Sequence, residues 1–206
     1  MKKKLVIFGN GNHAKIVKQE IQKNPKLELK AVFDFIDGKI KLNKKYNSIR
    51  INSRSKFYAI SAVGNNKVRY ELIKKISKLF KNVKWLSVIS KDAIVNKNVK
   101  IGNGTLVVSG SVINTNSVIG NHCIINTKST IDHDGKIGNF SDLAPGVNLA
   151  GNVRIGNFVF IGIGAAVKEK IKISSNIIIG AKSFVNKNCK SNMMYYGAPI
   201  KAIKKI

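Results

Sequence analysis

The sequence predicts a small α/β domain followed by a long parallel β-helix. In the first 86 residues, short apolar runs that end in Gly or Asp alternate with amphipathic segments, which is typical of a small parallel sheet. From Ile89 onward a branched aliphatic residue recurs every six residues, a period of neither helix nor plain strand. We therefore expect an α/β domain at 1–86, and a β-helix with a short C-terminal tail at 87–206.

The first domain is expected to contain three strands and two helices in alternation. KLVIFG, ending at Gly9, is followed by the amphipathic segment HAKIVKQEIQK. ELKAVFD, ending at Asp34, and FYAISAVG, ending at Gly64, precede the second amphipathic segment, NKVRYELIKKISKLF. Ligands on parallel sheets bind beyond the carboxyl ends of the strands, so Gly9, Asp34 and Gly64 are candidate binding positions.

The turn after the first strand, GNGNHA at 9–14, fits the loose G-x-G-x-x-A pattern of dinucleotide-binding turns. Asp34 lies where a ribose-binding acid would be expected, so a literal reading of the pattern indicates NAD. The domain is too short for the two mononucleotide halves of a full dinucleotide fold. A half-Rossmann domain that binds a nucleotide-linked sugar is the more economical interpretation. A tight turn without any ligand is the alternative.

The six-residue repeat occupies the second half of the chain. Its anchors are Ile, Val or Leu throughout: Ile89, Val95, Ile101, Val107, Ile113, Ile119, Ile125, Ile131, Ile137, Leu143, Leu149, Ile155, Ile161, Val167, Ile173, Ile179 and Val185. The residue four places after each anchor is nearly always small or β-branched. Three repeats close one triangular coil, in which the anchor points inward and Gly or Asn supplies positive φ at the corners. Each coil buries its core only against its neighbours.

The net charge of +27 raises the question of nucleic-acid binding, which the composition disfavours. The basic residues comprise 33 Lys and only 4 Arg, whereas specific readers of nucleic acid use Arg for bidentate base contacts. The Lys residues are spread along the chain instead of clustered. We expect no nucleic-acid partner, although a basic surface favours anionic small molecules.

Other features of composition indicate a cytoplasmic protein without a membrane span. No apolar run approaches the length that crosses a bilayer, and the run LVIF near the start is too short for a signal peptide. The two cysteines, Cys123 and Cys189, form no CxxC motif and suggest no disulfide framework.

A polar cluster interrupts the repeat in INTKSTIDHDGKIG, residues 125–138. His133 follows the inward-pointing Ile131 by two residues, where a side chain can face outward. A neutral imidazole accepts a proton near neutral pH, and an adjacent carboxylate such as Asp134 can fix its tautomer. The pair is a candidate general base. The alternative is an ordinary surface histidine.

Four stretches together resemble one family. They are GNGNHAKIV, AISAVGNNKVR, the segment INTKSTIDHDGKIG with LAPGVNLAGNVRIG, and YGAPIKAI near the end. The chain resembles the hexapeptide-repeat sugar acetyltransferases that include the sialic acid O-acetyltransferases and the UDP-4-amino-sugar N-acetyltransferases of bacillosamine synthesis. The resemblance implies a left-handed β-helix, a homotrimer with active sites between subunits, acetyl-CoA as co-substrate and no metal.

The resemblance also implies roles for particular residues. His133 is the general base, Asp134 orients it and Asn126 lines the same site. The predicted substrate-binding residues are Gly9, Gly11, Asn12, His13, Asp34, Gly64 and Asn65. The predicted cofactor-binding residues are Asp142, where the family often has His, Gly151, whose N–H is a candidate oxyanion donor, and Ile163, Gly164 and Ala181 along the pantetheine path.

The predicted function is N-acetylation of a nucleotide-linked amino sugar in the synthesis of bacterial surface glycans or glycoproteins. O-acetylation of sialic-acid-like sugars is the alternative, and a non-catalytic protein that binds sugar nucleotides is a further one. Another acyl-CoA donor is also compatible with the sequence. A zinc hydratase is disfavoured, because three histidine ligands are required and the repeat region holds only His122 and His133.

Overall fold

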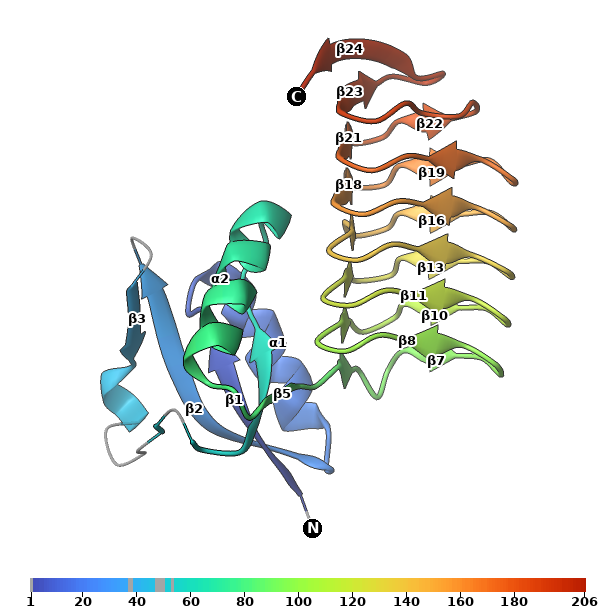
Figure 1. Ribbon diagram of the computed structural model, residues 1–206. Helices are drawn as coiled ribbons and strands as arrows, with labels where there is room; N and C mark the ends of the chain where they lie inside the picture. Colours follow the sequence, from blue (N-terminus) through green and yellow to red (C-terminus); the bar gives the residue numbers. More distant parts are fainter. Residues whose placement is uncertain (1, 37–38, 47–50, 53) are drawn as a thin grey trace.

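The computed structural model describes residues 2–36, 39–46, 51–52 and 54–206 (Figure 1). Its first part is a five-stranded sheet with the strand order β3-β2-β1-β4-β5. The elements are β1 Lys3–Phe8, α1 Asn12–Lys23, β2 Leu27–Ile36, β3 Lys39–Leu42, the 3-10 turn η1 Lys44–Tyr46, β4 Phe57–Ser61, α2 Asn66–Leu79 and β5 Val83–Trp85. All neighbouring strands are parallel except β2 and β3.

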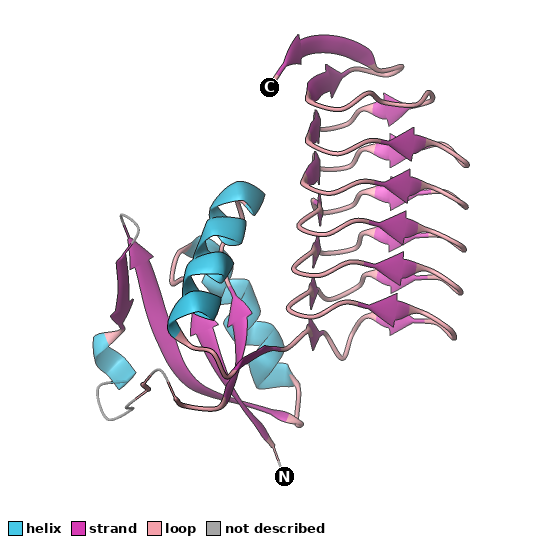
Figure 2. Ribbon diagram, viewed as in Figure 1, coloured by secondary structure: helices cyan, strands magenta, loops and turns pink. Residues whose placement is uncertain are grey.

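The two helices cover opposite faces of this sheet (Figure 2). On one face, Leu5 and Ile7 of β1 pack with Val17 of α1. On the other face, Phe8 packs with Leu72 of α2. Alternation of strand side chains therefore buries β1 on both faces, which explains its continuous apolar run.

The sheet has five strands where three were expected from the sequence: β3 and β5 were not predicted, and β2 is longer than expected. β2 does not end at Asp34 but continues to Ile36 and pairs with the unpredicted antiparallel strand β3, with Phe35 opposite Ile40. The sequence IDGKI at this point contains Asp-Gly, a hairpin signal that the βαβ interpretation passed over. Residues 37–38 themselves lie outside the described part of the chain.

The second part is a parallel β-helix with three sheets, here named B, C and D. Sheet B contains β6 Val88–Ile89, β9 Leu106–Val107, β12 Ile124–Ile125, β15 Asp142–Leu143, β18 Val159–Ile161, β21 Ile177–Ile179, β23 Met193–Tyr196 and β24 Lys201–Lys205. Sheet C contains β7 Ile94–Val95, β10 Val112–Ile113, β13 Thr130–Ile131, β16 Asn148–Leu149, β19 Ala166–Val167 and β22 Phe184–Val185. Sheet D contains β8 Lys100–Ile101, β11 Val118–Ile119, β14 Lys136–Ile137, β17 Arg154–Ile155 and β20 Lys172–Ile173. The predicted fold class, a half-Rossmann domain followed by a left-handed parallel β-helix, is confirmed.

Each coil lies in register on the next, so equivalent residues 18 positions apart are neighbours, as Ile113, Ile131 and Leu149 show. The anchors from Val107 onward fill a continuous core, whereas Val95 in the first coil is exposed. The small residues four places later are also buried, and several hydroxyls among them hydrogen-bond to the following coil; Ser117 Oγ, for example, donates to the carbonyl of Asp132 at 2.9 Å. These bonds satisfy polar atoms that the narrow prism desolvates.

The prediction that Gly or Asn supplies the positive φ at the corners of each coil is only partly correct. Positive φ recurs at every sixth residue, but several of these positions are not Gly or Asn: His122, Lys128, Asp134, Phe140 and Phe158 among others have φ between 55° and 60°. The glycines directly after the anchors instead allow close approach of coils. A β-carbon on Gly102 would lie 2.6 Å from the carbonyl carbon of Gly120. Stacking of the coils thus imposes a conformation that costs about 1 kcal/mol or more at each non-glycine corner.

The α/β domain packs on sheet B at the first coils (Figure 1). Val88, Leu106 and Ile124 of sheet B share one core with helix α1. The buried Glu20 of α1 accepts a hydrogen bond from Ser109 Oγ at 2.7 Å. The division at residues 86 and 87 stays a prediction. In the described residues, no helix is long and apolar enough to cross a membrane.

Candidate active site

The His133–Asp134 pair lies at the corner between sheets C and D, in the turn between β13 and β14. Asp134 Oδ2 lies 2.8 Å from His133 Nδ1, and Asp132 Oδ1 accepts a hydrogen bond from the His133 backbone N–H at 2.7 Å. About half of each side chain of the pair is exposed. The hydrogen bond to Asp134 raises the pKa of His133, and the same bond lowers the pKa of Asp134. Nε2 is therefore the nitrogen that is available to accept a proton.

Gly151 occupies the equivalent corner position in the next coil and faces the imidazole. A β-carbon built on Gly151 would lie 2.5 Å from His133 Nε2. The absence of a side chain leaves room for the ring at this corner. The role of its N–H as an oxyanion donor stays a prediction.

A second cluster of predicted residues lies at the junction between the α/β domain and the corner between sheets B and C. A pocket of about 280 Å³ is lined by His13, Gly64, Asn126, Asp142 and Ile163, and otherwise by Ile124, Leu143, Ala144, Pro145 and Phe160. The structure thus brings together the turn after β1, the loop after β4 and three coils of the β-helix. Five of the predicted site residues meet here, and they come from both halves of the chain.

Asp142 is almost fully buried, and its Oδ1 forms an ion pair with Arg69 Nη2 of α2. Arg69 also donates from Nε to the carbonyl of His122 at 3.0 Å, and from Nη1 to the carbonyls of Val63 and Gly64 at 2.9 and 3.0 Å. Burial raises the pKa of Asp142 to about 7, while the Arg69 guanidinium acts in the opposite direction. Arg69 was not among the predicted site residues, although it ends the quoted stretch AISAVGNNKVR.

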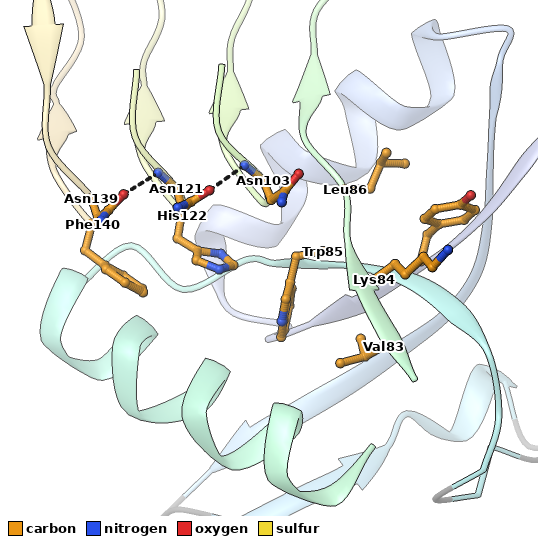
Figure 3. Close-up of a pocket in the computed structure, with 10 residues that line it drawn as sticks. Val83, Lys84, Trp85, Leu86, Asn103, Asn121, His122, Asn139 and Phe140 are labelled. Carbon is orange, nitrogen blue, oxygen red and sulfur yellow. Dashed lines mark hydrogen bonds between the residues drawn. The ribbon is translucent and has the colours of Figure 1, made fainter. Parts of the chain in front are cut away.

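Two histidines flank this ion pair. Burial and the Arg69 charge lower the pKa values of both His13 and His122 to about 4, so both are neutral at physiological pH. The ring of His122 stacks on Phe140 with the ring centres 5.1 Å apart, and Trp85 of β5 meets it edge-on at 5.3 Å. Figure 3 shows these rings beside a second, more open pocket of about 680 Å³, which none of the predicted site residues lines.

The remaining predicted substrate residues occupy the turn after β1 and the edges of the sheet. Gly9 has φ 105°, and its N–H donates to the Phe33 carbonyl at 2.7 Å. Gly11 is the N-cap of α1, which begins at Asn12.

Asp34 is half-buried on β2, and its carboxylate accepts a weak bond of 3.4 Å from Asn43 Nδ2. Asn65 caps α2 by accepting from the Val68 N–H at 3.0 Å. Asn65 also lines a groove of about 580 Å³. This groove adjoins the pocket of about 280 Å³, because Gly64 and Phe160 line both.

The predicted pantetheine residues Ile163, Gly164 and Ala181 lie along the corner between sheets B and C. Ile163 is exposed although it is apolar, and Gly164 has φ 64°. Asn126 starts the same corner two coils earlier, and its Oδ1 accepts from the Thr127 N–H at 2.8 Å.

A single chain does not bring all the predicted catalytic residues together. Asn126 lies at the corner between sheets B and C, whereas His133 and Asp134 lie one sheet further around the prism, at the corner between sheets C and D. His133 does not line the pocket that contains Asn126 and His13. Among the described residues, no group of three His, Cys, Asp or Glu side chains could hold a metal ion.

Comparisons with known proteins match this arrangement. Residues 4–76 match the family model of the PglD N-terminal domain. The acetyltransferase domain of PglB from Neisseria gonorrhoeae FA1090 superposes with a TM-score of 0.85 at 27% identity, covering 98% of this chain and 100% of that one. The same domain has been solved in complex with acetyl coenzyme A.

PerB from Caulobacter crescentus, in complex with CoA and GDP-perosamine, superposes with a TM-score of 0.84 at 28% identity, covering 97% of each chain. WeeI from Acinetobacter baumannii AYE shares the fold at 24% identity, with a TM-score of 0.81, covering 98% of this chain and 100% of that one. No curated protein sequence matches the chain.

The fold defines the class as a β-helix protein with an attached half-Rossmann domain, which is also the fold of these acetyltransferases. The predicted resemblance to the hexapeptide-repeat sugar acetyltransferases is confirmed.

Proposed function

We propose that the protein is an acetyl-CoA-dependent N-acetyltransferase that modifies the amino group of a nucleotide-linked amino sugar. The observation that carries this proposal is the pocket between the α/β domain and the β-helix, in which His13 of the nucleotide-type turn lies beside Asn126 and Asp142. Two similar structures support it, because one was solved with acetyl coenzyme A and the other with CoA and GDP-perosamine, an amino-sugar nucleotide.

We also propose a homotrimer in which one subunit supplies His133 to the pocket of its neighbour. Asn126 and His133 lie at different corners of one prism, so the proposed site needs a second copy to be complete. The outward residues of sheet C include the exposed apolar side chains of Ile94 and Phe184, and the smaller Ala166. These apolar side chains lie at the two ends of the outward row of sheet C, with Thr130 and Asn148 between them, and they are compatible with contact with another subunit. In the trimer, the cofactor would lie along the corner with Ile163, Gly164 and Ala181.

The chemistry follows from the geometry at His133. As the acceptor nitrogen attacks the thioester carbon, His133 Nε2 accepts a proton from it, and Asp134 stabilises the resulting imidazolium through Nδ1. The thioester oxygen becomes an oxyanion, for which the Gly151 N–H is the proposed donor. Collapse of the tetrahedral intermediate breaks the carbon–sulfur bond, and the His133 imidazolium returns its proton to the leaving sulfur, so that CoA thiol and the N-acetylated sugar are released. No covalent enzyme intermediate is required.

We place this enzyme in the cytoplasm, where acetyl-CoA and nucleotide sugars are made, in the synthesis of a surface glycan or glycoprotein. The two cysteines are buried and free, as expected in a reducing compartment. Residues 1–86 would bind the nucleotide-linked sugar, and residues 87–206 would bind acetyl-CoA.

The direct test is release of CoA thiol from acetyl-CoA with a panel of acceptors. The panel contains GDP-perosamine, UDP-linked 4-amino sugars and free sialic acid, each incubated with the wild type and with His133→Ala. Release with an amino-sugar nucleotide that disappears in the variant supports the proposal. Release with sialic acid alone would establish the O-acetyl alternative. Binding of sugar nucleotides without release from any acceptor would favour the non-catalytic alternative.

A further inference from the structure

The buried carboxylate of Asp142 has one oxygen without a partner. Oδ1 pairs with Arg69, whereas Oδ2 is buried and has no hydrogen-bond partner among the described residues. A desolvated carboxylate oxygen that lacks a donor is costly, and such groups in native proteins call for an explanation. A bound ligand is one source of the missing donor.

His13, which lines the same pocket as Asp142, also has a buried polar atom without a hydrogen-bond partner within the residues that the structure describes. Its Nε2 is buried and has no partner in the described part of the chain, and both His13 and Asp142 line the pocket of about 280 Å³. Most other lining side chains are apolar, with Asn126 as the third polar one. Ligand pockets commonly have this composition, in which a few polar groups fix the orientation of the ligand within an apolar wall.

Arg69 is not free to donate a hydrogen bond to Asp142 Oδ2 by changing its position. Its Nε, Nη1 and Nη2 are all engaged, with the carbonyls of His122, Val63 and Gly64 and with Asp142 Oδ1. The guanidinium therefore fixes the carboxylate in one orientation. The Arg69 charge favours the ionised form of Asp142, and an ionised carboxylate only accepts hydrogen bonds, so a ligand atom that completes Oδ2 in this form carries a proton.

We propose that Asp142 binds the amino group of the acceptor sugar through Oδ2, and that it thereby selects amino sugars over sugars that present a hydroxyl or a carboxylate at this position. The inference rests on the proposed function and names the residue that sets its acceptor class. An amine offers more N–H groups than a hydroxyl, and it bonds most strongly to a carboxylate as the ammonium ion, which loses one proton to solvent before it attacks the thioester. A sugar carboxylate would meet a like charge that is already desolvated. Asp142 thus occupies the position at which the hexapeptide-repeat sugar acetyltransferases often have a histidine.

The test measures binding without acetyl-CoA, so that it does not depend on turnover. Isothermal titration compares GDP-perosamine and a UDP-linked 4-amino sugar with their 4-hydroxy counterparts, for the wild type, Asp142→Asn and the surface control Asp92→Asn, whose carboxylate pairs with Lys23. We expect the wild type and the control to prefer the amino compound. We expect Asp142→Asn to lose about 10- to 100-fold of that preference while it binds the hydroxy compound about as well as the wild type.

The alternatives are separable. If Asp142→Asn does not fold, the double variant Arg69→Met with Asp142→Leu, which removes both charges, takes its place and should lose the same preference. An unchanged preference in the folded variant overturns the inference even if the wild type acetylates amino sugars, in which case the proposed function stands. A wild type that neither binds nor acetylates an amino-sugar nucleotide overturns both.

Discussion

Gly151 faces His133 across one coil of the β-helix, and a β-carbon on Gly151 would lie 2.5 Å from the imidazole Nε2. The residues are 18 positions apart in sequence, so only the stacking of coils makes them neighbours. The same nitrogen is the one that Asp134 leaves available as a base. Gly151 therefore controls the position of the group that we propose to accept the proton.

Gly151→Ala should lower kcat by about 10- to 100-fold, because a displacement of the imidazole by roughly 1 Å is costly in a positioned reaction. The backbone at Gly151 does not have positive φ, so the variant should fold. The melting temperature provides that control. Full activity in a folded Gly151→Ala variant would show that the imidazole does not need its present position.

Asp134→Asn should shift the acid limb of the kcat profile to lower pH. A base works only when it is neutral, so activity is lost as the pH falls through the pKa of His133. Asp134 raises that pKa, and its replacement should return it toward the ordinary value of about 6.5. The profile of kcat against pH, measured for both proteins, gives the two midpoints. Coincident midpoints would contradict the role of Asp134.

Arg69→Met should destabilise the protein by about 3–5 kcal/mol, because it leaves the buried Asp142 carboxylate without a compensating charge. Chemical denaturation gives the free energy of unfolding. The matched variant Arg69→Met with Asp142→Leu should recover part of the loss, but not the bonds from Arg69 to the carbonyls of Val63 and Gly64. A single variant as stable as the wild type would contradict the account of this junction.

His122→Phe should make the fold less sensitive to acid. In the folded protein the pKa of His122 is lowered to about 4, below its unfolded value of about 6.5. Its contribution to stability is therefore complete above pH 6.5 and is lost as the pH falls from 6.5 through 4, by up to about 3 kcal/mol. Phe in its place can stack on Phe140 without titrating.

Stability measured between pH 4 and pH 7 should fall less steeply for His122→Phe than for the wild type. Some slope should remain, because His13 has a similarly lowered pKa. His133→Asn, which changes an exposed histidine whose pKa is raised instead of lowered, is the control and should not make the slope shallower. Identical slopes for the wild type and His122→Phe would contradict this prediction.

The β-helix was predictable from the sequence because its anchors repeat within one chain, and each must be branched and apolar to fill the prism. The His133–Asp134 contact was predictable because the two residues are adjacent in sequence. The hairpin of β2 and β3 was missed although an Asp-Gly pair signals it.

The ion pair of Arg69 and Asp142 could not be predicted, because its partners are 73 residues apart and belong to different layers of the fold. The separation of Asn126 from His133 was also invisible in the sequence. The two residues are close along the chain, yet the coil turns through a whole sheet between them. The spacing of residues along the repeat shows at which corner of the prism each residue lies only when the path of the coil is known.

The measurement that tests the central claim most directly is mass spectrometry of the acceptor after incubation with acetyl-CoA and the purified protein. With a nucleotide-linked 4-amino sugar, we predict that the mass increases by one acetyl group on the amino nitrogen with the wild type, and that no product forms with His133→Ala. An unmodified amino sugar with the wild type, or equal product with both proteins, would contradict the account.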